Sequence, residues 1–310
     1  MKRETAVTDI ATEFLTVRDL LRYAVSRYNA ADLTFGHGTS SALDDAVFLI
    51  LESLHLPIED INPWLEARLT LDERRLLVER IDTRVDERIP TPYLVNKAYI
   101  QGVPFYIDRR VIVPRSFIGE ILFSERFGED DELALIPNRQ AVGAVADICT
   151  GSGCLAILAS QVFPNAEIDA VDLSPDALEV AAINVDRLAS GRVNLFGGDL
   201  LTPLEGRRYD IIISNPPYVD DEAMADLPDE YRAEPEMALT GGFDGLDLVR
   251  RLIDQAPNFL NDDGGLLCEI GTGREALELS YPSLPFQWLD TAESEGEVFW
   301  ITAADLKRTN

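Results

Sequence analysis

One segment of the sequence combines small residues and an acid in a spacing that suits ligand binding. It is the run Asp147-Ile148-Cys149-Thr150-Gly151-Ser152-Gly153-Cys154, which follows a short apolar stretch and precedes an apolar segment with helical spacing. Glycines in such a turn let the backbone approach a ligand closely. Asp172 stands 19 residues after Gly153, where the next predicted strand ends, and its carboxylate can accept two hydrogen bonds from ribose hydroxyls. These features predict a nucleotide-binding site at the edge of a sheet.

The residues that are missing from this turn limit which nucleotide it can bind. A phosphate-binding P-loop requires a lysine after its glycines, and a dinucleotide site favours a third glycine, but neither is present here. A ligand without phosphates suits the acidic turn better. S-adenosylmethionine is such a ligand, because its amino-acid end is zwitterionic and its sulfonium is positive. Asp147 favours those cations, while Asp199 and Leu200 offer adenine a polar contact and an apolar wall.

A second segment, Asn215-Pro216-Pro217-Tyr218, follows the predicted strand 210–214 at the same edge of the sheet. A planar amide or amino nitrogen is a poor nucleophile because its lone pair is delocalised, so catalysis needs acceptors that hold both N–H groups. The side-chain carbonyl of Asn215 and the backbone carbonyl of Pro216 suit that task, and Tyr218 can stack on the planar group. Alignment of the nucleophile, the methyl group and the departing sulfur supplies much of the rate. The motif therefore predicts methyl transfer to a planar nitrogen.

Alternating strands and helices are expected to position these two segments. From about Ser116 onward, apolar runs and turn signals predict strands at 143–149, 167–172, 193–196, 210–214, 265–270 and 298–301. Predicted helices cover 154–163, 246–260 and 274–281, and a further helix begins with Ser174 as its N-cap and Pro175 in its first turn. Repeated βα units predict a mostly parallel sheet that is covered on both faces.

The preceding part of the chain is predicted to be helical. Helical spacing begins after Thr16 and again over 41–54, and Thr70 with Glu73 forms a capping-box signature before a third helix. Residues 98–100 and 104–107 predict a hairpin, and 111–115 an extended bridge. We therefore expect a helical substrate-recognition domain over 1–92, a hairpin linker over 93–115 and a catalytic domain over 116–310. The long irregular segment 215–244 is typical of a functional loop.

The glycine turn and the Asn-Pro-Pro-Tyr motif together resemble those of the class I S-adenosylmethionine-dependent methyltransferases. Two groups share the second motif: the nucleic-acid amino methyltransferases and the protein glutamine-N5 methyltransferases of the HemK/PrmC type. The helical N-terminal part, the hairpin, Val113-Pro114-Arg115-Ser116 and Glu234-Pro235-Glu236-Met237-Ala238-Leu239 resemble the second group. This resemblance covers nearly the whole chain.

Three further segments resemble the PrmB branch of that family, whose members methylate a glutamine of ribosomal protein uL3. They are residues 34–39 (Thr-Phe-Gly-His-Gly-Thr), 93–98 (Tyr-Leu-Val-Asn-Lys-Ala) and 227–232 (Leu-Pro-Asp-Glu-Tyr-Arg). The sister branch acting on peptide-chain release factors usually has Pro-Arg-Pro-Glu-Thr-Glu, where this chain has Pro114-Arg115-Ser116-Phe117-Ile118-Gly119-Glu120. The departure favours the ribosomal-protein branch. It leaves two roles open for Arg115 and Glu120, which either shape the substrate pocket or form a buried pair at the domain interface.

The resemblance implies a fold, a cofactor and a set of site residues. The implied fold is an α/β class I Rossmann-like sheet, mostly parallel with one antiparallel edge strand, with a small N-terminal helical domain and a hairpin linker. The implied cofactor is S-adenosylmethionine, with S-adenosylhomocysteine as product. Including Leu173 beside Asp172, the predicted cofactor-binding residues are Asp147, Cys149, Thr150, Gly151, Ser152, Gly153, Asp172, Leu173, Asp199, Leu200 and Asn215. The predicted catalytic residues are Asn215, Pro216 and Tyr218, and the predicted substrate-binding residues are Asn215, Pro216, Pro217, Tyr218 and Arg115.

The composition narrows the function further. The chain has 310 residues and a formal charge of −28, of which residues 1–114 carry −4 and residues 115–310 carry −24. Such acidity argues against non-specific binding to a phosphate backbone. Three cysteines are too few for a disulfide framework, and the two histidines lack metal-ligand spacing, so no metal site is predicted. We expect a cytoplasmic protein without a secretory signal or a membrane span.

The acidic residues gather behind the second motif. Residues 220–236 hold eight acids and one base, Arg232. We hypothesise that this segment steers a basic substrate, ribosomal protein uL3, since complementary fields raise encounter rates. A salt-rich cell interior is the competing explanation. The rival functions are a release-factor glutamine methyltransferase, a nucleic-acid amino methyltransferase and a non-enzymatic assembly factor. No direct nucleic-acid or membrane partner is expected, and the oligomeric state is not assigned.

Overall fold

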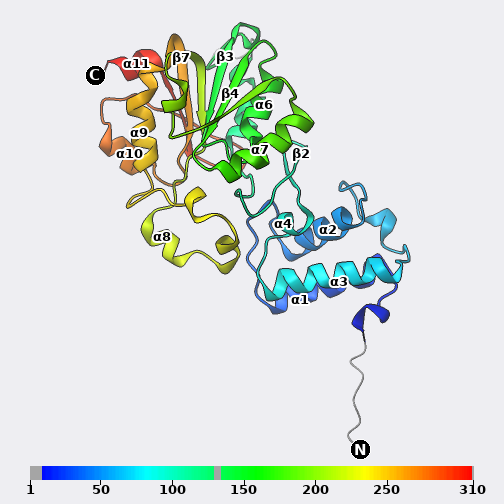
Figure 1. Cartoon of the computed structure of the whole chain (residues 1–310). Coiled ribbons are helices and arrows are strands. Elements are labelled where there is room, and N and C mark those ends of the chain that lie inside the picture. Colours follow the sequence, from blue (N-terminus) through cyan, green and yellow to red (C-terminus); the bar gives the residue numbers. More distant parts are fainter. Residues whose placement is uncertain (1–8, 129–133, 309–310) are drawn as a thin grey trace, which may run out of the picture. The chain divides into compact units, whose positions relative to one another are not determined.

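The computed structural model describes residues 9–128 and 134–308. Residue contacts divide the chain into two compact units (Figure 1). The helical unit comprises residues 1–97 together with 228–233, and the sheet unit comprises 98–227 together with 234–310. Within the described residues, none of the helices has the length and apolar character that crossing a bilayer requires.

The helical unit packs three amphipathic helices, α1 (Val17–Ala30), α2 (Ala42–Ser53) and α3 (Leu71–Asp86). Thr16 with Asp19, and Thr70 with Glu73, form the capping boxes that start α1 and α3. The core is formed by buried side chains such as Leu20, Leu49, Leu77 and Ile81. The short helix α4 (Thr91–Val95) has Pro92 in its first turn, a position to which proline is well suited. The remaining elements of this unit are η1 (Ile10–Thr12), η2 (Asn62–Trp64) and η6 (Asp229–Ala233).

The sheet unit contains a seven-stranded sheet with the strand order β5-β4-β3-β6-β7-β9-β8. The strands are β3 (Ala144–Ile148), β4 (Glu167–Asp172), β5 (Val193–Gly197), β6 (Tyr209–Ser214), β7 (Leu260–Glu269), β8 (Gln287–Leu289) and β9 (Val298–Thr302). The predicted mostly parallel sheet is confirmed. Its antiparallel strand, β9, lies one place inside the edge, because β8 pairs with its outer side. A separate hairpin joins β1 (Ala98–Ile100) to β2 (Val103–Phe105).

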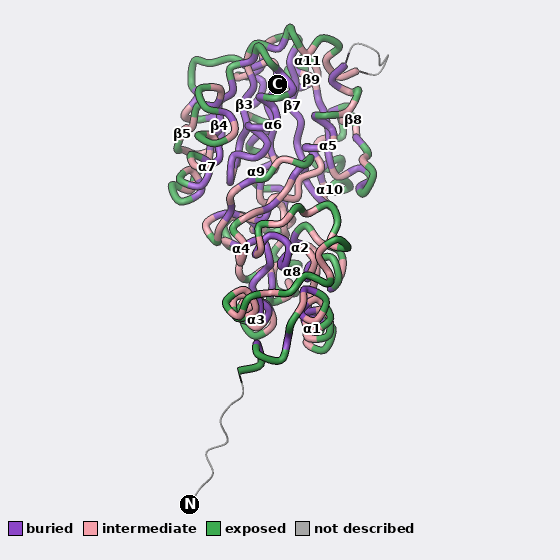
Figure 2. The backbone as a smooth tube through the Cα atoms, turned by 90° about the vertical axis from the view of Figure 1, so that its right-hand side faces the viewer, coloured by how far each residue is buried: buried purple, intermediate pink, exposed green. Residues whose placement is uncertain are grey.

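Helices cover both faces of this sheet (Figure 1). Apolar side chains of α5 (Ile118–Phe123), α6 (Cys154–Val162) and α7 (Pro175–Leu188) pack against one face, and those of α9 (Asp247–Gln255), α10 (Arg274–Ser280) and α11 (Ala303–Lys307) against the other. Figure 2 shows the central strands buried and the outer turns exposed. The remaining elements are α8 (Asp221–Asp226), η3 (Glu125–Phe127), η4 (Arg139–Ala141), η5 (Thr202–Leu204), η7 (Glu236–Ala238) and η8 (Ala256–Asn258).

Some elements differ from the sequence-based expectation. Helix α9 ends at Gln255 rather than near 260, because Pro257 turns the chain into η8. Strand β7 begins at Leu260 rather than near 265, although Leu260 is followed by the turn-forming residues Asn-Asp-Asp-Gly-Gly. Helices α5 and α8 and strand β8, which are three to six residues long, were not predicted. Such lengths are too short for periodicity to show.

Candidate active site

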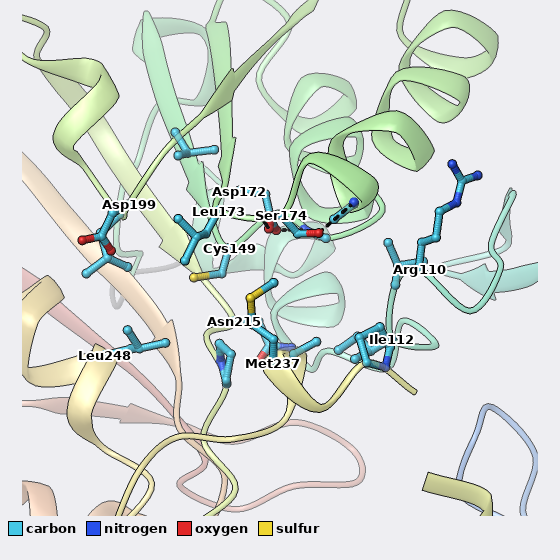
Figure 3. A pocket seen from close by; sticks show the side chains of 18 of the residues that line it. Arg110, Ile112, Cys149, Asp172, Leu173, Ser174, Asp199, Asn215, Met237 and Leu248 are labelled. Carbon is cyan, nitrogen blue, oxygen red and sulfur yellow. Dashed lines mark hydrogen bonds between the residues drawn. The ribbon is translucent and has the colours of Figure 1, made fainter. Parts of the chain in front are cut away.

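The predicted site residues gather where β3, β4 and β6 end. A pocket lies at this edge, and all its lining residues belong to the sheet unit (Figure 3). Its empty volume, including the open mouth, is about 760 Å³. The predicted residues that line it are Cys149, Gly151, Asp172, Leu173, Asp199, Leu200, Asn215 and Pro217. The structure thus brings the glycine turn, the end of β4 and the Asn-Pro-Pro-Tyr motif to one cavity.

Asp147 anchors the glycine turn from below and does not line the pocket. Its Oδ2 accepts hydrogen bonds from the Thr150 hydroxyl, at 2.5 Å, and from the Ala156 backbone N–H, at 2.9 Å. Its Oδ1 is buried and has no hydrogen-bond partner among the described residues. Burial raises the pKa of Asp147 to about 7, while its two hydrogen bonds oppose the shift. The turn is therefore built on a carboxylate with one unsatisfied oxygen.

Asp172 orients its carboxylate through two backbone groups. Its Oδ2 accepts from the Gly151 N–H and its Oδ1 from the Ser174 N–H, both at 2.8 Å. Burial raises the pKa of this carboxyl group, and the hydrogen bonds from Ser174 and Gly151 oppose the shift. Each oxygen retains a lone pair that can accept a hydroxyl of a bound ligand.

Three predicted residues of the turn, Thr150, Ser152 and Gly153, do not line the pocket. Ser152 accepts a hydrogen bond at its backbone carbonyl from Asn184 Nδ2, at 2.9 Å. Gly153 has a left-handed backbone, and a Cβ at this position would lie 3.3 Å from the Cβ of Ala181. These residues shape the turn and its packing against α7. A glycine suits position 153 because a side chain there would crowd the helix.

The Asn-Pro-Pro-Tyr segment leaves the end of β6. Asn215 and Pro217 line the pocket, whereas Pro216 and Tyr218 do not. The Tyr218 hydroxyl donates to Glu269 Oε1 at 3.0 Å. Burial is the main cause that raises the pKa of this phenol, and the charge of the nearby Glu269 raises it further. The loop beyond is fixed by Val219, whose N–H donates to the Leu239 carbonyl at 2.9 Å.

The linker forms a wall of the pocket that sequence reasoning missed, through Arg110, Val111 and Ile112. It is held by Asn184, a fully buried residue of α7 that bonds both the N–H and the carbonyl of Tyr106, at 2.8 and 2.9 Å. Figure 3 shows the Arg110 guanidinium directed away from the other lining side chains. It pairs with Asp108 and Glu179, each at 2.7 Å.

Arg115, predicted to bind substrate, does not line the pocket. Its guanidinium forms two hydrogen bonds to the buried carboxylate of Glu234, at 2.7 and 2.8 Å. Glu120 accepts from the Ala292 N–H at 2.9 Å. Glu234 and Met237 were part of a segment that resembles the family but were not predicted as site residues, and Glu269 was not singled out. Glu269 ends a strand at the same sheet edge as Asp172, and that position is a signal that could have found it.

The electrostatics of the site favour a cationic ligand without phosphates. Asp147, Asp172 and Asp199 lie in or beneath the pocket, and its lining cation, Arg110, is already paired. The unsatisfied Oδ1 of Asp147 adds a buried acceptor. Across 9–128 and 134–308, no group of three or more His, Cys, Asp and Glu side chains is arranged to hold a metal ion.

The chain is similar to several known methyltransferases. A family model described as the methyltransferase small domain matches residues 133–230. A protein of Bradyrhizobium diazoefficiens named ribosomal protein uL3 glutamine methyltransferase is 55% identical over 95% of this chain and 92% of its own length. A protein of the same name from Burkholderia pseudomallei is 50% identical over 97% of this chain and 98% of its own. The solved structure of a methyltransferase from Pyrococcus furiosus is 17% identical over 66% of this chain and 89% of its own, with a TM-score of 0.46.

Proposed function

Because the chain belongs to the family of ribosomal protein uL3 glutamine methyltransferases, we propose that it methylates the side-chain amide nitrogen N5 of a glutamine in uL3. The methyl donor is S-adenosylmethionine, and the products are N5-methylglutamine and S-adenosylhomocysteine. The observation that carries this proposal is a single pocket lined by both Asp172 and Asn215. A ribosomal-protein substrate also implies that the enzyme works in the cytoplasm.

The residues present fit this cofactor. When bound, S-adenosylmethionine supplies a methyl group on a positively charged sulfur. The Asp172 carboxylate, already oriented by Gly151 and Ser174, accepts the ribose hydroxyls. The Asp172 and Asp199 carboxylates, which line the pocket, favour the cationic groups of the ligand. Leu173 and Leu200 add apolar lining for the adenine.

Asn215 and Pro216 act on the glutamine amide. The Asn215 Oδ1 accepts one N–H of the amide and the Pro216 carbonyl accepts the other, so that the lone pair of the nitrogen points toward the methyl group. Tyr218 stacks on the amide plane. Positioning of this kind supplies much of the rate when no base has to act before transfer. As the N–CH₃ bond forms, the S–CH₃ bond breaks, and the nitrogen then releases one proton to water, which restores a neutral amide.

The substrate class follows from charge as well as from family. Apart from the buried Glu230 and Glu234, the acids of residues 220–236 lie at the surface or half-buried, and ribosomal proteins are basic. The catalytic part carries −24, which disfavours a nucleic-acid substrate. The relatives named above are uL3 methyltransferases, which favours uL3 over a release factor.

Asn215→Ala separates binding of the cofactor from transfer of the methyl group. We expect transfer to a uL3-derived glutamine peptide to fall roughly 100- to 1,000-fold, as for loss of one essential catalytic hydrogen-bonding group. The calorimetric affinity for S-adenosylhomocysteine should change by only a few-fold. Asn165→Ala, which removes an exposed amide away from the pocket, is the matched control. Turnover close to wild type in Asn215→Ala would remove the proposed role of this residue.

A further inference from the structure

Glu269 is a buried carboxylate that the proposed transfer step does not use. It is the last residue of β7 and is 1% exposed. Its Oε2 accepts from the Ser116 hydroxyl at 2.7 Å and from the Phe117 N–H at 2.9 Å. Its Oε1 accepts from the Tyr218 hydroxyl at 3.0 Å. One side chain therefore joins the segment after the linker to the aromatic ring of the Asn-Pro-Pro-Tyr motif.

The backbone of three glycines packs closely against Tyr218. A Cβ at Gly271 would lie 2.7 Å from Tyr218 Cε2, so a side chain there would collide with the ring. A Cβ at Gly241 would lie 2.7 Å from the Tyr218 Cα, and one at Gly245 would lie 2.3 Å from its carbonyl oxygen. Gly245 and Gly271 also have positive φ angles, of 75° and 55°. The backbone around Tyr218 is thus packed directly against the ring and the main chain of this residue.

Burial of a carboxylate lowers the stability of the fold, because the charged group loses its hydration. Burial raises the pKa of Glu269, while the hydrogen bonds from Ser116, Tyr218 and Phe117 oppose the shift. An apolar side chain of similar size would pack without that desolvation cost. A carboxylate offers something an apolar group lacks: directional acceptors for three donors at once. The geometry is that of a group that fixes orientation.

We propose that Glu269 is a positioning residue for methyl transfer, which holds the Tyr218 ring at a fixed angle through its hydroxyl. The inference rests on the proposed function, in which this ring stacks on the glutamine amide. Because a stacked ring sets the plane of the amide, the ring angle sets the direction of the nitrogen lone pair. Asn215 and Pro216 then hold an amide whose plane is already defined.

Three variants test this role. Glu269→Leu and Tyr218→Phe each remove the bond between the carboxylate and the hydroxyl but keep the aromatic ring. We expect kcat to fall roughly 10- to 100-fold, as for a small misplacement of reacting groups. The KM for the peptide and the affinity for S-adenosylhomocysteine should change little. The double variant should be no slower than the slower single variant. Glu269→Gln should recover most of kcat, because its oxygen can accept from Phe117 while its NH₂ donates to Tyr218.

Tyr209→Phe is the matched control. Tyr209 is a buried phenol of β6, the strand that leads into the Asn-Pro-Pro-Tyr segment, and it donates to the Asp169 carboxylate at 2.7 Å outside the pocket. The variant Tyr209→Phe should lower Tm without lowering kcat. NMR of ¹³C-labelled tyrosine gives a readout that needs no turnover: the Tyr218 ring should flip slowly in the wild type and faster in Glu269→Leu.

Two results would overturn the inference: wild-type kcat in a folded Glu269→Leu, or equal ring-flip rates in both proteins. A wild-type enzyme that fails to methylate uL3 would instead contradict the proposed function, and the ring-flip comparison would still decide the role of Glu269.

Discussion

Asp147 shows how one side chain can be structural and still shape ligand chemistry. Its Oδ2 bonds the hydroxyl of Thr150 and the N–H of Ala156, which closes the glycine turn onto the start of α6. Its Oδ1 remains without a partner at 0% exposure. A buried carboxylate with an unsatisfied oxygen costs stability when it is charged. The residue therefore links the stability of the fold to pH.

The pH dependence follows from the raised pKa. The pKa of Asp147 is about 7 in the folded protein against 3.8 ordinarily. Between about pH 4 and pH 7 the folded protein holds a proton here that the unfolded chain lacks, so this group makes the fold less stable as the pH rises. Asp147→Asn is neutral at every pH. Its Tm relative to wild type should be higher at pH 7.5 than at pH 5.5. An equal Tm difference at both values would contradict a raised pKa.

Residue types and local spacing were enough to predict several residues that line the pocket. The glycine turn, Asp172 and Asn215 could be predicted because each signal lies within a few residues of a strand end. The strand-end position of Glu269 could have marked it as a candidate, but its hydrogen bonds could not be predicted, because its three donors are 152, 153 and 51 residues away in the chain. Residues brought together by folding leave no local pattern to read.

At the scale of elements, α7 does more than cover the sheet. Its residue Asn184 bonds Tyr106 of the linker and Ser152 of the glycine turn, so one helix fixes two walls of the pocket. All three hydrogen bonds are 2.8–2.9 Å long, and the side chain is fully buried. Loss of this amide leaves buried backbone groups unpaired, which costs more than the bonds themselves contribute.

Asn184→Leu should release the linker wall. We expect faster hydrogen–deuterium exchange over residues 106–112 and roughly tenfold weaker binding of S-adenosylhomocysteine, equivalent to about 1.4 kcal/mol. Glu179→Ala is the control. Glu179 lies on the same helix as Asn184, and its surface ion pair with Arg110 is expected to contribute little to stability. Unchanged exchange over 106–112 in Asn184→Leu would show that the linker is held by other contacts.

The element boundaries show what periodicity can predict. Long segments with caps, such as α1, α3 and α7, were predicted because Thr16, Thr70 and Ser174 mark their starts chemically. Strand β8 was missed because three residues carry no alternation, and it forms only by pairing with β9. Whether the predicted domain limits at 92 and 115 mark functional units stays a prediction.

At the scale of the whole molecule, the acidic residues that give the chain its charge of −28 do not all have the same role. Of the eight acids in residues 220–236, two are buried and paired. Glu230 accepts from the Thr34 N–H at 3.0 Å and from Arg88 at 3.1 Å within the helical unit, and Glu234 binds Arg115 within the sheet unit. The sequence pattern alone did not separate these two from their neighbours. The segment 228–233 belongs to the helical unit although its flanking residues do not.

The remaining exposed acids are the ones that can steer a basic substrate. Neutralising Asp221, Glu222, Asp226 and Glu236 should slow association with uL3 roughly tenfold at low ionic strength and flatten its salt dependence. The matched control neutralises four exposed acids outside the pocket, Asp186, Glu205, Asp263 and Glu295. Stopped-flow binding measures both sets. Equal effects of the two sets would favour general acidity, as expected of a salt-rich cell, over steering by residues 220–236.

The central claim is that this chain methylates one glutamine of uL3. Mass spectrometry of uL3 incubated with S-adenosylmethionine and either wild-type enzyme or Asn215→Ala tests it most directly. We predict that a single glutamine-containing peptide gains the mass of one methylene with the wild type and remains unmodified with the variant. Unmodified uL3 alongside methylated release factor in the same experiment would contradict the account.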